Sequence, residues 1–179
     1  NAYERLNDVE NAIASYNKLL LIEKIDPMDR YKAAAKTNLK HLWSIVDPQL
    51  EPLRKKIMLN PSDTDSLFQL AMALDKQGRY EESLTDYRKI ELSGKGSWQL
   101  FYNIANVLKK LGKYQDAATS YEKSLALKPD YSDTQNNLGL IYRKLGKYPE
   151  AINAFEQAMA LDEDYAFAPF NLGVTYFRM

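Results

Sequence analysis

The sequence has no cysteine and one histidine, His41, among its 179 residues. Disulfides, thiolate nucleophiles and zinc–thiolate sites are therefore excluded, and a lone imidazole leaves a transition metal few ligands. The longest aliphatic run, Leu19–Ile22, is far shorter than the roughly 20 residues of a membrane helix. Lys plus Arg and Asp plus Glu are equal, 24 each, so no net charge favours nucleic acid or an anionic membrane. We expect no cofactor, no metal, no membrane insertion and an intracellular, cytoplasmic location.

Glycine is also scarce, with 7 residues, but three of them recur at a fixed interval. Each is followed by a basic residue and a tyrosine, in the blocks that begin at Gly78, Gly112 and Gly146. The interval from the first block to the second equals that from the second to the third. A constant period of this length, about 34 residues, predicts a repeat architecture.

Each repeat contains two stretches with different patterns. The stretch before the glycine carries apolar residues at helical spacing, such as Leu67, Leu70 and Leu74, and the glycine suits a helix end. The stretch after it pairs a small residue with an aromatic one four positions later. These pairs are Ser83 with Tyr87, Ala117 with Tyr121, and Ala151 with Phe155. A small residue permits close helix approach and the ring fills the remaining volume, so each repeat predicts a helix pair.

This pattern resembles the tetratricopeptide repeat family, with Leu138-Gly139 and Tyr142 in its first helix and Pro61 and Pro129 at repeat ends. The resemblance implies an all-α, right-handed solenoid of antiparallel helix pairs. We expect a partial repeat at 1–26 and a degenerate helical pair at 27–63, where Pro48 and Pro52 bound a helix or disturb it. Full repeats follow at 64–97, 98–131 and 132–165, and a first helix without its partner at 166–179.

In this family the first helices line a concave groove that commonly binds extended peptides or partner helices. Gln69, Asn103, Asn137 and Asn171 stand one repeat apart in those helices, and Asn106 is a further amide nearby. Amides can satisfy a peptide backbone without reading its sequence. The series resembles the asparagine ladder of the O-linked N-acetylglucosamine transferase solenoid, although asparagine is also simply common at this place. On the same face we expect Phe68, Met72, Tyr102, Leu140 and Phe170, of which Phe68 and Phe170 could equally pack between neighbouring helices.

Basic residues gather near the ends of the first helices: Lys76, Lys109, Lys110, Arg143 and Lys144. They could form a rim that attracts an acidic peptide, but the helix dipole alone explains cations there. One subfamily clamps the C-terminal carboxylate of chaperone tails with lysines early in its first helices. Asp65, Gln99, Phe68, Tyr102 and Asp133 occupy those positions here, so we expect no such clamp.

The pattern indicates a non-catalytic scaffold that binds a protein or peptide. Two alternatives remain open: a substrate-recruiting arm of a larger enzyme, such as a glycosyltransferase, and self-association. The end at 166–179 carries several apolar residues, including Phe167, Phe170 and Phe177, which would favour self-association if nothing covers them.

Overall fold

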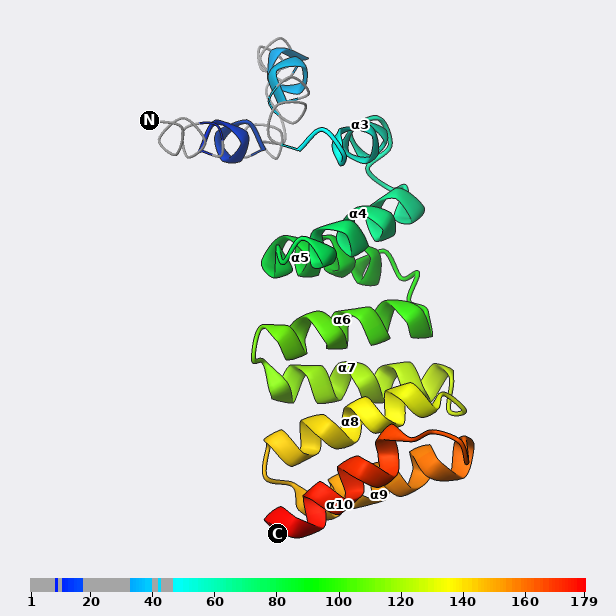
Figure 1. Cartoon of the computed structure of the whole chain (residues 1–179). Coiled ribbons are helices and arrows are strands. Elements are labelled where there is room, and N and C mark those ends of the chain that lie inside the picture. The colour runs from blue at the N-terminus through cyan, green and yellow to red at the C-terminus, as the bar shows by residue number, and fades with distance from the viewer. Residues whose placement is uncertain (1–8, 10, 18–32, 40–41, 43–46) are drawn as a thin grey trace. The chain divides into compact units, whose positions relative to one another are not determined.

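The computed structural model describes residues 9, 11–17, 33–39, 42 and 47–179 (Figure 1). The chain divides into two compact units, residues 1–66 and 67–179, which are considered separately below. His41 lies outside the described residues.

The second unit is a stack of helices joined by short turns (Figure 1). In chain order it contains the larger part of α4 (Thr64–Lys76), α5 (Tyr80–Leu92), α6 (Trp98–Lys110), α7 (Tyr114–Leu127), α8 (Ser132–Lys144), α9 (Tyr148–Leu161) and α10 (Phe167–Arg178). Helices α6 and α7 pack as one pair and α8 and α9 as another, while α5 contacts α6 and α7 contacts α8. Neighbouring pairs therefore bury each other, and the unit is an α-solenoid. We call α4, α6, α8 and α10 the first helices, and α5, α7 and α9 the second helices.

The glycine of each three-residue block ends a first helix, as predicted. Gly78, Gly112 and Gly146 have φ angles of +78°, +72° and +74°, in the region that favours glycine. The next residue then donates its N–H to a carbonyl five positions back, as Lys113 does to Leu108 at 2.9 Å. This bond satisfies a carbonyl that the helix end would otherwise leave open, and the following tyrosine starts the second helix.

The small and aromatic positions of the second helices form the core between the paired helices. The small positions, Ser83, Ala117 and Ala151, have no exposed surface, and the aromatic ones, Tyr87, Tyr121 and Phe155, are at most 1% exposed. Ser83 donates its hydroxyl to the carbonyl of Ala71 at 2.7 Å, so even the polar member of the set is satisfied. The predicted packing role of these pairs is confirmed.

The first unit contains α3 (Glu51–Leu59). Pro52 stands in the first turn, where it removes no helical hydrogen bond, so this proline begins the helix rather than disturbing it. At the end of the unit, Asp63 accepts hydrogen bonds from the backbone N–H and the hydroxyl of Ser66, at 3.1 and 2.7 Å. These bonds lower the pKa of Asp63 and cap the start of α4.

Across the residues that the structure describes, there is no β-strand. The helices of this part are too short and too polar to cross a membrane. The same residues contain no group of three histidine or acidic side chains placed to hold a metal ion.

Candidate functional site

The predicted ladder occupies one position on successive first helices. Gln69 lies on α4, Asn103 on α6, Asn137 on α8 and Asn171 on α10. Gln69 is exposed, whereas the three asparagines are half-buried. The asparagines are therefore close enough to neighbouring helices to bond with them, yet still reach solvent.

Asn137 is held between two side chains of the preceding first helix, α6. Its Nδ2 donates to the hydroxyl of Tyr102 at 3.3 Å, and its Oδ1 accepts from Nζ of Lys109 at 3.2 Å. A primary amide has two donor hydrogens and two acceptor lone pairs. Asn137 thus keeps one donor and one acceptor for another molecule.

Helix α10 repeats this arrangement on α8 with different side chains. Nδ2 of Asn171 donates to Oδ1 of Asn136 at 2.9 Å, and Nη1 of Arg143 donates to the backbone carbonyl of Asn171 at 3.2 Å. Asn136 and Arg143 stand one repeat after Tyr102 and Lys109. Polar contacts at equivalent positions therefore join α6 to α8 and α8 to α10.

Two of the basic residues, Lys109 and Arg143, donate hydrogen bonds to ladder residues. Burial lowers the pKa of Lys109, and the neighbouring Lys110 lowers it further. Burial likewise lowers the pKa of Arg143, with a smaller effect from Arg178. These partly desolvated cations strengthen any hydrogen bond that they donate.

The remaining predicted rim residues do not share this role. Lys110 donates to both carboxylate oxygens of Asp75, at 2.7 and 2.8 Å, and lies 5.3 Å from the centre of the Tyr80 ring. It therefore ties α6 to α4. Lys76 and Lys144 bond to no ladder residue.

Three of the predicted groove residues make contacts with second helices. The ring of Phe68 meets that of Tyr87 edge-on at 5.5 Å, and Tyr102 meets Tyr121 edge-on at 5.9 Å. Oδ1 of Asn106 accepts from the hydroxyl of Tyr121 at 2.5 Å. Since Tyr121 is fully buried, Asn106 satisfies a hydroxyl that would otherwise be costly to bury.

The other predicted apolar residues differ in how far a ligand can reach them. Met72 is 38% exposed and Phe170 is 71% exposed. Leu140 is half-buried. Together with the ladder, these residues define what we call the first-helix face: Gln69, Met72, Tyr102, Asn103, Lys109, Asn137, Leu140, Arg143, Phe170 and Asn171.

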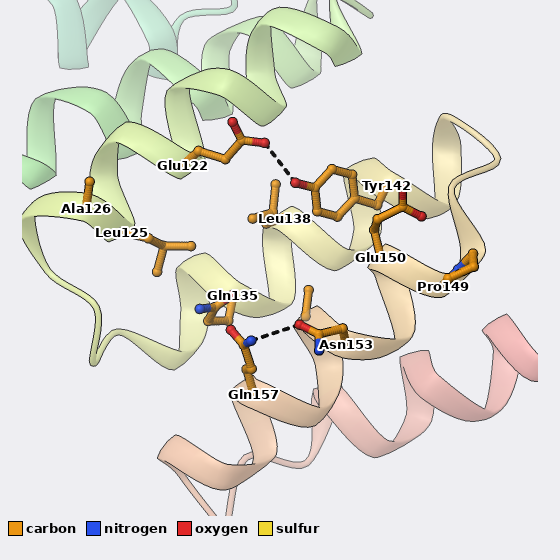
Figure 2. A pocket seen from close by; sticks show the side chains of 11 residues that line it. Glu122, Leu125, Ala126, Gln135, Leu138, Tyr142, Pro149, Glu150, Asn153 and Gln157 are labelled. Carbon is orange, nitrogen blue, oxygen red and sulfur yellow. Dashed lines mark hydrogen bonds between the residues drawn. The ribbon is translucent and has the colours of Figure 1, made fainter.

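A pocket of about 660 Å³ lies elsewhere, over α8 and between α7 and α9 (Figure 2). We call it the α8 trough. It is lined by Glu122, Leu125, Ala126, Gln135, Leu138, Tyr142, Pro149, Glu150, Asn153, Ala154 and Gln157. The residues that α8 contributes follow i, i+3, i+7 spacing, which is a different face of the helix from that of Asn137 and Leu140.

Two hydrogen bonds order the trough (Figure 2). The hydroxyl of Tyr142 donates to Oε1 of Glu122 at 2.7 Å, and Nε2 of Gln157 donates to Oδ1 of Asn153 at 2.8 Å. Burial, and then the bond to Glu122, raise the pKa of Tyr142 to about 12. Tyr142 therefore remains a neutral donor throughout the physiological pH range.

The trough was not among the predicted sites, although the sequence contains one signal of it. Gln135 is polar where the two preceding repeats have Leu67 and Phe101. A polar residue at an apolar position of a repeat marks a place where the core pattern is interrupted. Which neighbours would surround it depends on contacts between repeats, and these are not visible in the spacing.

Two family profiles match the chain, and both are described as tetratricopeptide repeat. One matches residues 99–164, and the other matches residues 1–26 and 64–91, so that together they cover more than half of the chain. A comparison with curated proteins finds no match.

Several solved structures share the fold. A crystal structure of MamA is 17% identical, covers 87% of this chain and 85% of its own, and has a TM-score of 0.68. YrrB, described as a TPR protein with an unusual peptide-binding site, is 24% identical, with 79% and 74% covered and a TM-score of 0.67. The first TPR of Spaghetti (RPAP3), bound to the HSP90 peptide SRMEEVD, is 22% identical, with 64% and 91% covered and a TM-score of 0.60. At these identities the likeness shows the fold alone.

Proposed function

Because the chain belongs to the tetratricopeptide repeat family, a family of protein-interaction modules, we propose that its first-helix face binds an extended peptide of a partner protein. The observation that carries the proposal is the bonding of Asn137. Its amide is oriented by Tyr102 and Lys109 and keeps one donor and one acceptor. A peptide unit presents the matching acceptor and donor.

The equivalent position in the next repeat, Asn171, supports a ligand that runs across several helices. Asn171 is tied to α8 by two hydrogen bonds, as Asn137 is tied to α6. Ordered amides at a regular interval suit an extended chain, whose peptide groups are also regularly spaced. Met72, Leu140 and Phe170 supply apolar area for its side chains.

We infer a non-catalytic role for this face. Its polar side chains are amides, phenols and cations that bond mainly to one another or to backbone carbonyls. Such groups recognise and orient a ligand. Lys109 and Arg143 would add charge-assisted bonds to carbonyls of the peptide.

The test is selection of binders from a random peptide library, followed by calorimetry with the selected peptide. The Asn103→Ala/Asn137→Ala double variant should bind it about 30-fold more weakly, since it loses at least two hydrogen bonds and each contributes about 1 kcal/mol net. Gln115→Ala, which removes an exposed amide from second helix α7, is the matched control and should bind as the wild type does. Equal affinity of the double variant and the wild type would refute the proposal.

A second candidate, self-association, is favoured by the exposed aromatic rings of α10. Phe167, Phe170 and Phe177 are 67%, 71% and 91% exposed. Burying such rings against a second copy would be favourable. Sedimentation equilibrium should show a mass that rises with concentration in the wild type and less so in Phe170→Ser/Phe177→Ser. A mass independent of concentration would exclude it.

A further inference from the structure

The α8 trough has two chemically different ends. The carboxylates of Glu122 and Glu150 and the phenol of Tyr142 line one end, whereas the amides of Gln135, Asn153 and Gln157 line the other (Figure 2). Leu138 lies between the two ends. From Gln135 to Tyr142 the helix rises about 10 Å, at about 1.5 Å per residue.

The preceding repeat shows what occupies the corresponding surface when it is filled. Phe101 and Lys123 stand one repeat before Gln135 and Gln157. Nζ of Lys123 lies 5.3 Å from the centre of the Phe101 ring and forms an ion pair with Oε1 of Glu91 at 2.8 Å. There the chain covers its own surface with an aromatic ring and a lysine.

Both parts of that cover are missing from the α8 trough. Gln135 replaces the ring and Gln157 replaces the lysine, while Leu125 stands at the place of Glu91. The trough is therefore open because these side chains are shorter or uncharged. The opening follows from the side chains of this repeat.

The charge of the two surfaces also differs. Arg88, Lys123, Glu91 and Asp116 in the preceding repeat are two cations and two anions, and the first three form ion pairs. The corresponding residues of the trough are Glu122, Gln157, Leu125 and Glu150, which leave two anions alone.

No ion pair with Glu122 or Glu150 occurs within the part of the chain that the structure describes. Lys147 approaches the same end, but its Nζ lies over the Tyr142 ring, 5.9 Å from the ring centre. The excess negative charge of the trough therefore remains available to a cation from another molecule.

We propose that the α8 trough binds a lysine side chain of a partner protein. Its ammonium group lies between Glu122 and Glu150, its methylene stem packs on Leu138, and its peptide groups bond to the amide end. This site is on a different face from the peptide site proposed above, so each can fail without the other.

The test uses nuclear magnetic resonance of the ¹⁵N-labelled chain with three small probes. N-acetyl-lysine amide should shift the side-chain amides of Gln135, Asn153 and Gln157 saturably, with a Kd on the order of 1 mM for a ligand of this size. Its Nε-acetylated, uncharged analogue should bind at least about fivefold more weakly. Pentylamine, which lacks peptide groups, should shift residues near Glu122 and Glu150 but bind more weakly than the lysine probe.

Three variants sharpen the result. Glu122→Gln/Glu150→Gln should weaken binding of the lysine probe about tenfold, and Gln135→Phe, which restores the ring of the preceding repeat, should abolish it. Glu156→Gln changes an exposed carboxylate of α9 outside the trough and should leave binding unchanged. Circular dichroism of each variant checks its helicity.

Three outcomes would overturn the proposal. They are no saturable shift at the trough amides, equal binding of the charged and uncharged probes, and unchanged binding in folded Glu122→Gln/Glu150→Gln. Pentylamine binding as tightly as the lysine probe would exclude a peptide occupant and identify the site as one for simple amines.

Discussion

Substitution of Gly139 by alanine tests the close packing of α8 on α9. A Cβ atom added at Gly139 would lie 2.6 Å from Cε1 and 2.8 Å from Cδ1 of the Phe155 ring. Phe155 has no exposed surface, so the ring cannot move into solvent. Overpacking of this kind costs about 1–3 kcal/mol.

Gly173 provides a matched control because it stands at the equivalent position of the next first helix, α10. A Cβ atom there would meet no atom within 4 Å. Alanine favours a helix over glycine by about 1 kcal/mol at either site, so the difference between the variants isolates the clash. We expect Gly173→Ala to stabilise the chain by about 0.5–1 kcal/mol and Gly139→Ala to be less stable than it by about 1–3 kcal/mol.

Urea unfolding monitored by circular dichroism measures both free energies, and hydrogen exchange assigns each change to α8 or α10. A double-mutant cycle with Phe155→Leu should show that the alanine costs less once the ring is gone. If Gly139→Ala and Gly173→Ala stabilise the chain equally, the steric reasoning is refuted. Ala105 and Tyr121 coexist at the same two places one repeat earlier, so the clash reflects how closely this helix pair approaches.

Three further predictions concern hydroxyl groups and one acidic position. Thr134→Val should stabilise the chain by about 1 kcal/mol in urea unfolding, since the buried Thr134 hydroxyl finds no hydrogen-bond partner among the described residues. Thr175→Val should instead destabilise the chain, because the Thr175 hydroxyl donates to the backbone carbonyl of Asn171 at 2.7 Å. A destabilised Thr134→Val variant together with a stabilised Thr175→Val variant would contradict both predictions. Tyr142 has its pKa raised from 10.0 to about 12, so the folded state holds this proton more tightly and its contribution is lost as the pH rises through that range. The wild type should thus lose stability faster than Tyr142→Phe between these pH values, and parallel curves would contradict the raised pKa of Tyr142. The peptide SRMEEVD should not bind detectably in calorimetry, because acidic Asp133, already bonded to Tyr165 at 2.6 Å, stands where a carboxylate clamp needs lysine; micromolar binding would overturn this.

Much of the fold could be predicted because the signals for each helix pair lie close together in the sequence. The glycine with positive φ marks the end of the first helix. The small residue and the aromatic residue after it mark the face that the second helix packs into the core. The first unit was harder to predict because proline has two meanings in a helix. Pro52 is compatible with a first turn and incompatible with an interior, and only the observed start at Glu51 decides between them.

The bonds of the candidate sites were less predictable for a different physical reason. The spacing placed Asn137 on the same face as Tyr102, but not its hydrogen bonds to Tyr102 and Lys109. Those bonds join residues 35 and 28 positions apart and depend on how two first helices are offset. A periodic pattern gives the direction of each side chain from its own helix. It does not give the side chain that meets it from the next repeat.

The α8 trough shows how a repeat protein can gain a site through substitutions of side chains. Successive repeats share their order of helices, so side chains that cover the surface in one repeat can be missing in the next. Phe101 and Lys123 close the surface between α5 and α7, and Gln135 and Gln157 leave the next one open. Glu122 stands where the preceding repeat has Arg88, and Gln157 stands where it has Lys123, so substitutions in this repeat also determine the charge of what can enter the trough. Opening and charge thus depend on different positions of the same repeat, so Gln135→Phe tests the opening and Glu122→Gln/Glu150→Gln tests the charge.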